Sequence, residues 1–295
     1  MGNSYVLSCC STADLSKEYL EQRDIHYICF HLQIDGKEYM DDLGQSIPFP
    51  DFYKALVAGA ASKTSQVNAD EYLTYFRSFL ERGLDVLHLC LSSGISGTYN
   101  SAQLAAKTLQ EEFPFRKVYI VDSLGASSGY GLLMDKLADM RDEGKTIDEV
   151  WNFALANRLN LNHWFFSTDL SFYVKGGRIS RSAYVLGSAL GICPLLNMDS
   201  EGKLIPQDRI RTKNKVIRTI VQKMVENAKG GLEYNEKCFI SQSACLEDAQ
   251  AVADLVEKTF PKLNGKVMIN DIGTVIGTHT GPGTVALFFW GRERA

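Results

Sequence analysis

Several features are scarce or missing from this 295-residue chain. No apolar stretch approaches the roughly 20 residues that a helix needs to cross a bilayer. The first residues do not combine a cationic segment with a long apolar run, so we expect no secretory signal. Together these absences argue against an integral membrane segment and favour a cytoplasmic protein.

Cysteine is present, but in no recognised ligand or disulfide pattern. The chain has seven cysteines and no C-x-x-C spacing, so we expect neither a metal site nor a cofactor. Cys9 and Cys10 are adjacent and are expected to be reduced thiols at a strand end, the alternative being a reactive thiol in a cleft. The five histidines are far apart in the sequence. His88, inside an apolar run, is predicted to be a core residue.

Excess positive charge is also missing, because the formal net charge is −4. An acidic chain has no general attraction for nucleic acid, which disfavours a DNA-binding module. Basic side chains nevertheless gather in one part of the sequence, at Lys175, Arg178, Arg181, Arg209, Arg211 and Lys213. Such a group is either an ordinary solvated surface or a docking site for an acidic partner or a phosphate.

The first half of the chain alternates strand-like and helix-like segments. Apolar runs predict strands at residues 5–10, 26–34, 84–91 and 118–121. Apolar residues with a period of 3.6 predict helices at 48–57, 69–82, 99–112 and 131–141. This alternation predicts a parallel sheet covered by helices on both faces, hence a three-layer α/β/α domain over residues 1–162.

The second half has a different order of elements. A helix at 147–160 leads to an aromatic strand at 164–167 and to two short helices, at 170–174 and 183–190. Residues 194–198 and 203–211 predict a β-hairpin with a glycine-containing turn. Helices at 216–227 and 248–260 then alternate with strands at 237–241 and 266–270. We predict an α+β domain with a mixed sheet over residues 163–295, with a ligand between the two domains.

Three polar loops follow or precede the predicted strands. Residues 92–99, with Ser93 and Ser96, lie between a strand and a helix, where free N–H groups attract anions. Thr64 and Ser65 precede another helix, and simple helix capping would explain hydroxyls in both loops. The third loop, residues 122–129, lacks G-x-G-x-x-G, and no phosphate-binding loop occurs elsewhere, so nucleotide binding has no support.

Residues 277–283 contain three glycines, a proline and His279. Such a composition predicts an irregular segment, held here between apolar neighbours, that offers N–H groups and an imidazole to a small anion. A tight turn between two core strands is the alternative. His279 could also activate Ser96 in an acyl ester hydrolase. The nucleophile pattern G-x-S-x-G is broken by Thr98, however, and no acid partner is evident.

The motifs together resemble the DegV family of bacterial fatty-acid-binding proteins. The resemblance is carried by SSGISGTYNSA at 92–102, KGGRIS at 175–180 and HTGPG at 279–283, with TSQ at 64–66 and YMD at 39–41. It implies a two-domain α/β protein, not an enzyme, that holds one long-chain fatty acid in a buried tunnel. It also implies that an ATP-dependent fatty acid kinase receives the acyl chain and makes an acyl phosphate for phospholipid synthesis.

The resemblance also assigns residues. It implies that Thr64, Ser93 and His279 hold the carboxylate, supported by Ser65 and Ser96. Two arginines, Arg178 and Arg211, would lie where the kinase docks. The sequence departs from the family pattern at Cys10, where an aspartate is usual, and at Val67, where a proline is usual.

Overall fold

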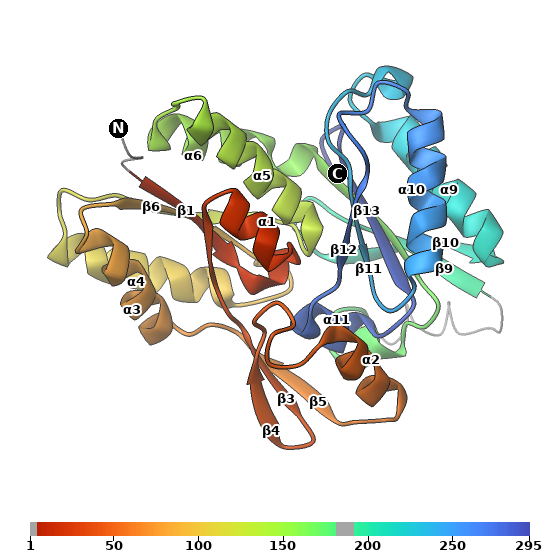
Figure 1. Cartoon of the computed structure of the whole chain (residues 1–295), viewed down its shortest axis with the longest axis horizontal. Helices are drawn as coiled ribbons and strands as arrows, with labels where there is room; N and C mark the ends of the chain where they lie inside the picture. The colour runs from red at the N-terminus through yellow and green to blue at the C-terminus, as the bar shows by residue number, and fades with distance from the viewer. Residues whose placement is uncertain (1–4, 181–191) are drawn as a thin grey trace.

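The computed structural model describes residues 5–180 and 192–295 (Figure 1). Arg181 and the predicted helix at 183–190 lie outside the described residues. The fold is α/β, as predicted, and contains a four-stranded parallel sheet, a six-stranded mixed sheet and a small three-stranded antiparallel sheet. In the described ranges no helix combines the length and apolarity needed to span a membrane.

The parallel sheet belongs to the first half of the chain. Its strands lie in the order β2-β1-β6-β7, with the bounds Tyr5–Cys10 (β1), Ile25–Ile28 (β2), Asp85–Cys90 (β6) and Val118–Asp122 (β7). The inner strands β1 and β6 are almost wholly buried, which explains their continuous apolar runs. Helices cover both faces of this sheet. Helices α3 (Ala69–Leu80) and α4 (Thr98–Glu112) pack on one face, and α5 (Ser128–Asp142) and α6 (Ile147–Asn157) pack on the other.

The mixed sheet belongs to the second half. Its strands lie in the order β10-β9-β8-β13-β11-β12, with the bounds Leu161–Ser167 (β8), Ile192–Met198 (β9), Leu204–Arg211 (β10), Phe239–Gln242 (β11), Met268–Asp271 (β12) and Thr284–Trp290 (β13). The hairpin β9–β10 confirms the prediction. Helices α9 (Lys213–Asn227) and α10 (Leu246–Thr259) pack on the outer face.

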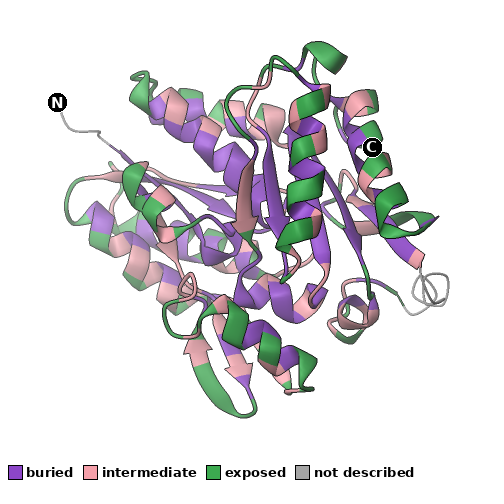
Figure 2. Ribbon diagram, turned by 45° about the vertical axis from the view of Figure 1, so that its right-hand side comes forward, coloured by how far each residue is buried: buried purple, intermediate pink, exposed green. Residues whose placement is uncertain are grey.

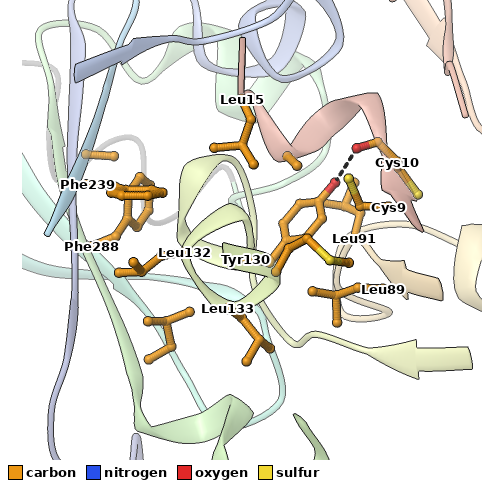
Figure 3. Packing of buried hydrophobic residues seen from close by; sticks show 14 of the residues in the cluster. Cys9, Cys10, Leu15, Leu89, Leu91, Tyr130, Leu132, Leu133, Phe239 and Phe288 are labelled. Atoms are coloured by element: carbon orange, nitrogen blue, oxygen red, sulfur yellow. Dashed lines mark hydrogen bonds between the residues drawn. The ribbon is translucent and has the colours of Figure 1, made fainter. Parts of the chain in front are cut away.

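Helix α5 lies between the two large sheets and contacts both. Most of its residues are buried, in keeping with this central place (Figure 2), and its polar stripe of Asp135, Asp139 and Asp142 forms ion pairs with Arg23. In Figure 3 the Tyr130 ring points toward β1, where its hydroxyl donates to the Cys10 carbonyl at 3.1 Å. Leu132 lies toward Phe239 and Phe288 of the mixed sheet. One helix therefore joins the cores of both sheets.

The predicted strand at 26–34 is wrong as a single element. Residues 25–28 form β2 in the parallel sheet, whereas β3 (His31–Ile34) belongs to the small sheet with β4 (Lys37–Met40) and β5 (Ser62–Ser65). The chain changes sheet at Phe30, whose backbone groups bond outside both sheets. The Phe30 N–H donates to the Ser11 hydroxyl at 3.1 Å, and the Phe30 carbonyl accepts from the Asp41 N–H at 2.9 Å. The side chains of α2 (Phe49–Val57) give the small sheet a core of its own.

The prediction of an irregular segment at residues 277–283 is wrong for 277–280 and holds for 281–283. Residues 277–280 are the last turn of helix α11 (Thr274–Thr280), which ends at Gly281 with a φ of 68°. Gly277 is not there for loop flexibility: a Cβ would lie 2.6 Å from the Tyr53 hydroxyl and 2.8 Å from the Phe52 ring. Glycine thus lets α11 pack closely on α2. Because the helix uses its own N–H groups, this segment presents a side chain rather than backbone donors.

Candidate functional site

A cavity of about 560 Å³ lies between the parallel sheet and the mixed sheet. Its size falls within the range of small-molecule sites, roughly 300–1,000 Å³. The loops after β6 and β7 and the inner face of the mixed sheet supply its walls, and α11 closes one end. Carboxyl ends of parallel strands are the usual place for a ligand in such a fold, so the cavity is the candidate site.

Most of the cavity wall is apolar. Alternate residues of β13, namely Thr284, Ala286 and Phe288, face the cavity, and Phe165 does so from β8. Side chains two apart share a face of a strand, which explains this spacing. The wall along β13 spans four residue steps, about 13 Å at roughly 3.3 Å per residue. The apolar wall is therefore elongated along β13.

One end of the cavity is polar. His279, near the end of α11, forms a hydrogen bond of 2.8 Å between its Nε2 and the Thr64 hydroxyl on β5. Burial, aided by the charge of Arg178, lowers the pKa of His279 to about 4. The imidazole is consequently neutral at physiological pH. No group in the described ranges bonds its Nδ1, which faces Gly176, where a Cβ would lie 2.3 Å away.

Arg178 lies in the wall of the same cavity. Its guanidinium donates to the backbone carbonyls of Gly176 and of Ile95, the latter at 3.1 Å. Burial lowers its pKa, and within residues 5–180 and 192–295 no carboxylate forms an ion pair with it. A half-buried cation without a counter-charge favours an anionic ligand.

The predicted hydroxyls do not all reach the cavity. Thr64 and Ser96 line it, and Ser65 lies exposed at its rim. Ser93 does not line it: the side chain is exposed, and its N–H donates to Asp122 at 3.0 Å. Ser92 takes the inward position in this turn and donates to the Gly202 carbonyl at 2.9 Å. Ser96 is therefore better placed than Ser93 to contact a ligand in this cavity, and the assignment of Ser93 stays a prediction.

Two buried carboxylates hold the helix that carries His279. Asp41 accepts hydrogen bonds from the Thr274 N–H at 3.0 Å and the Thr274 hydroxyl at 2.6 Å, and Asp14 accepts from the Gly273 N–H at 3.0 Å. Carboxylates at a helix N-terminus satisfy N–H groups that lack helical partners. Burial raises the pKa of both acids. Their positions fix α11 and therefore the imidazole.

The geometry does not favour a serine hydrolase. The Ser96 hydroxyl accepts from the Thr98 N–H at 3.2 Å, and the His279 Nε2 is bonded to Thr64 instead. In the described part of the chain no carboxylate orients the imidazole through Nδ1. Acyl transfer by a serine requires a nucleophile hydrogen-bonded to a base, and a base hydrogen-bonded to an orienting acid. The described residues of this site do not form such a chain.

Sequence reasoning missed part of the site. Arg178 was expected at a docking surface, and it lies in the cavity wall; nothing in the sequence distinguishes the two places. His163, buried on β8, also lines the cavity, and its Nε2 accepts from the Ala126 N–H at 3.3 Å. Arg211 is exposed at the end of β10 and stays a predicted docking residue.

The depressed pKa of His279 predicts a pH effect on the ligand-free protein. Between pH 6.5 and about 4 the unfolded chain takes up a proton that folded His279 does not. Acidification through this window is therefore expected to destabilise the native protein, by up to about 3 kcal/mol. His279→Gln should lack this component, so denaturant titrations of the two proteins should diverge as the pH falls. Parallel pH profiles would contradict the assignment.

Comparisons with known proteins agree with the geometry. The family model described as "Uncharacterised protein, DegV family" matches residues 10–292. The DegV domain-containing protein CPE0026 of Clostridium perfringens is 35% identical over 287 residues, 97% of each chain. Two relatives of solved structure are described as binding fatty acids. The DegV family protein from Thermus thermophilus has 26% identity and a TM-score of 0.86, covering 98% of this chain and 100% of that one.

The second, TM841 from Thermotoga maritima, has 28% identity and a TM-score of 0.83, covering 99% of this chain and 100% of that one. A more distant protein shares the fold, with 21% identity and a TM-score of 0.85 over 98% and 100% of the two chains. It is the Fatty Acid Kinase (Fak) B3 protein of Streptococcus pneumoniae, loaded with linoleic acid. The proteins from Thermus thermophilus and Thermotoga maritima are both described as binding fatty acids. The chain described here belongs to the DegV family.

Proposed function

We propose that this protein is a carrier that binds one long-chain fatty acid in the cavity between its two large sheets. The observation that carries the proposal is the pairing of an apolar wall with a polar end at which Arg178 has no carboxylate partner among the described residues. A fatty acid has the complementary form, an apolar chain ending in one negative charge. The fatty acids bound by the two solved relatives support the same ligand class.

The proposal gives each polar residue a task. In this proposal neutral His279 carries its proton on Nε2 and donates to the Thr64 oxygen, which leaves the Thr64 hydroxyl hydrogen free for a carboxylate oxygen. Ser96 supplies a second hydroxyl, and Arg178 balances the charge. Hydrogen bonds to a charged group contribute about 1.5–3 kcal/mol each.

The acyl chain supplies most of the binding free energy. Each buried methylene contributes about 0.8 kcal/mol, so a long chain supplies on the order of 10 kcal/mol before the ordering costs are subtracted. Phe165, Ala286 and Phe288 would contact this part of the ligand. The polar end then fixes the orientation, with the carboxylate beside α11.

We further propose that the bound acid is presented to an ATP-dependent fatty acid kinase. The family resemblance supports this step, and so does the name of the Streptococcus pneumoniae protein, at the level of a shared fold. Arg211 is exposed, and in this proposal it contacts the kinase rather than the lipid. Lys213 is less suited, since it already pairs with Asp248 at 2.6 Å.

The test has two arms. Native mass spectrometry of protein purified without detergent should show a mass excess of one fatty acid, which solvent extraction removes. Lipid-loaded protein, mixed with a bacterial fatty acid kinase and ATP, should yield acyl phosphate, and Arg211→Ala should lower that yield while retaining the lipid. A ligand-free mass that palmitate and oleate leave unchanged would overturn the carrier proposal. Equal turnover by Arg211→Ala would remove Arg211 from the docking surface.

The two serines of one loop provide a matched comparison for the carboxylate site. Ser96→Ala is expected to weaken the binding of oleate by about 1.5–3 kcal/mol, because Ser96 lines the cavity. Ser93→Ala should leave the affinity unchanged, because the Ser93 side chain is exposed. Titration of delipidated protein measures both. A loss for Ser93→Ala alone would place the carboxylate on the other side of the loop.

A further inference from the structure

We propose that Cys10, His88 and Cys90 form a binding site for a zinc ion. The three side chains meet at the carboxyl ends of β1 and β6, and their ligand atoms all lie within 4.8 Å of one another. Each residue is 0% exposed. This cluster is not evident in the sequence, because its members are separated by up to 80 positions and only the pairing of β1 with β6 brings them together.

The distances suit tetrahedral coordination. Zinc binds sulfur at about 2.3 Å and imidazole nitrogen at about 2.0–2.1 Å, which places the two ligand atoms roughly 3.6 Å apart. Cys10 Sγ and His88 Nε2 are 3.6 Å apart. The Tyr72 hydroxyl lies 3.3 Å from Cys10 Sγ and could approach the fourth position. The Cys10 and His88 ligand atoms are thus already at the separation that a shared zinc ion requires.

The surroundings of His88 leave the correct nitrogen available. Its Nδ1 is 2.9 Å from the Ser8 hydroxyl, which is itself 2.8 Å from the Tyr75 hydroxyl. A metal-bound histidine usually donates its other ring N–H to such a partner, which fixes the tautomer and the ring orientation. If Nδ1 donates to Ser8, the lone pair of Nε2 points toward Cys10. Ser8 is therefore a positioning residue for the metal.

Charge and ligand type favour a soft divalent ion. Two thiolates balance the charge of Zn²⁺, so the filled site is neutral and suits a fully buried place. Thiolate and imidazole ligands select zinc over the hard ions magnesium and calcium. None of the three ligands lines the lipid cavity, so the site is independent of the proposed function. Full burial also means that the ion enters as the protein folds.

The experiment uses the full-length protein, purified with a non-thiol reductant and no chelator. Metal content is measured by mass spectrometry, and protein unfolded in a chelator is refolded with Co²⁺ as a spectroscopic probe. One zinc per chain is expected, together with the thiolate-to-cobalt charge-transfer band and the visible bands of tetrahedral Co²⁺. Wild-type protein that refolds without these bands and contains no zinc would overturn the proposal.

Variants locate the site. Cys10→Ser and Cys90→Ser should lose the ion, whereas Cys9→Ser should keep it, because Cys9 is equally buried but faces the other side of β1. Ser8→Ala should lower zinc affinity by about 10- to 100-fold in competition with a chromophoric chelator. Retention of the cobalt spectrum by both ligand variants would overturn the proposal. If these variants do not fold, the intensity of the wild-type charge-transfer band reports the number of thiolates, and a spectrum without thiolate would be equally decisive against it.

Discussion

Ala286→Trp is expected to abolish the tight binding of long-chain fatty acids. Ala286 lies midway along the cavity-facing side of β13, between Thr284 and Phe288. An indole at this point fills the space in which the acyl chain would continue. The loss of contact with about four methylenes removes about 3 kcal/mol, more than a hundredfold in affinity. Titration of delipidated protein with acids of increasing length should show a cut-off that the native protein lacks.

The same position supplies the control. Ala286→Ser conserves the volume and should retain long-chain binding, so a loss in both variants would indicate damage to the mixed sheet rather than a blocked cavity. Short-chain acids should bind Ala286→Trp and native protein alike, because the polar end at His279 is unchanged. A folded Ala286→Trp protein that still binds palmitate tightly would show that the chain runs elsewhere.

Asp41→Ala is expected to lower the free energy of unfolding by about 3 kcal/mol or more. The substitution leaves the Ser11 hydroxyl and two donors of Thr274 without their buried acceptor, and an unsatisfied buried group costs about 1–3 kcal/mol. Because Thr274 begins the helix that ends near His279, fatty acid affinity should fall as well. Urea denaturation and fatty acid titration measure the two effects.

The neighbouring residue is a matched control for this effect. Asp42 is half-buried, and its carboxylate bonds only within its own turn, to Gln45 and Ser46, among the described residues. Asp42→Ala should therefore cost less than about 1 kcal/mol and leave lipid affinity unchanged. Equal losses for Asp41→Ala and Asp42→Ala would mean that Asp41 does not hold α11.

The sequence predicted the large sheets because their signals are local. Apolar runs such as that of β6 and the alternation with helices require only neighbouring residues to be recognised. The small sheet was missed for the opposite reason. Strands β4 and β5 are short and mostly polar, so they lack an apolar run. The change of sheet depends on hydrogen bonds from the Phe30 backbone to Ser11 and Asp41, which only the structure reveals.

The site was predicted in composition but not in arrangement. Thr64, Ser96 and His279 do line one cavity, yet His279 lies on a helix because Gly277 serves packing rather than flexibility. Ser93 and Ser96 cannot be ranked from sequence, since the direction in which each serine of a turn points depends on its hydrogen bonds. Long-range partners decide these details, and a single sequence does not record them.

The position of β13 in the mixed sheet has a consequence for protein synthesis. This strand lies between β8 and β11, although it is the last of the described strands to be translated. The inner wall of the cavity therefore cannot form on the ribosome until β13 has emerged, whereas the parallel sheet can assemble earlier. On the proposed function, fatty acid loading is therefore expected only after β13 has been made, and a nascent chain that stalls before β13 has no closed compartment for a lipid.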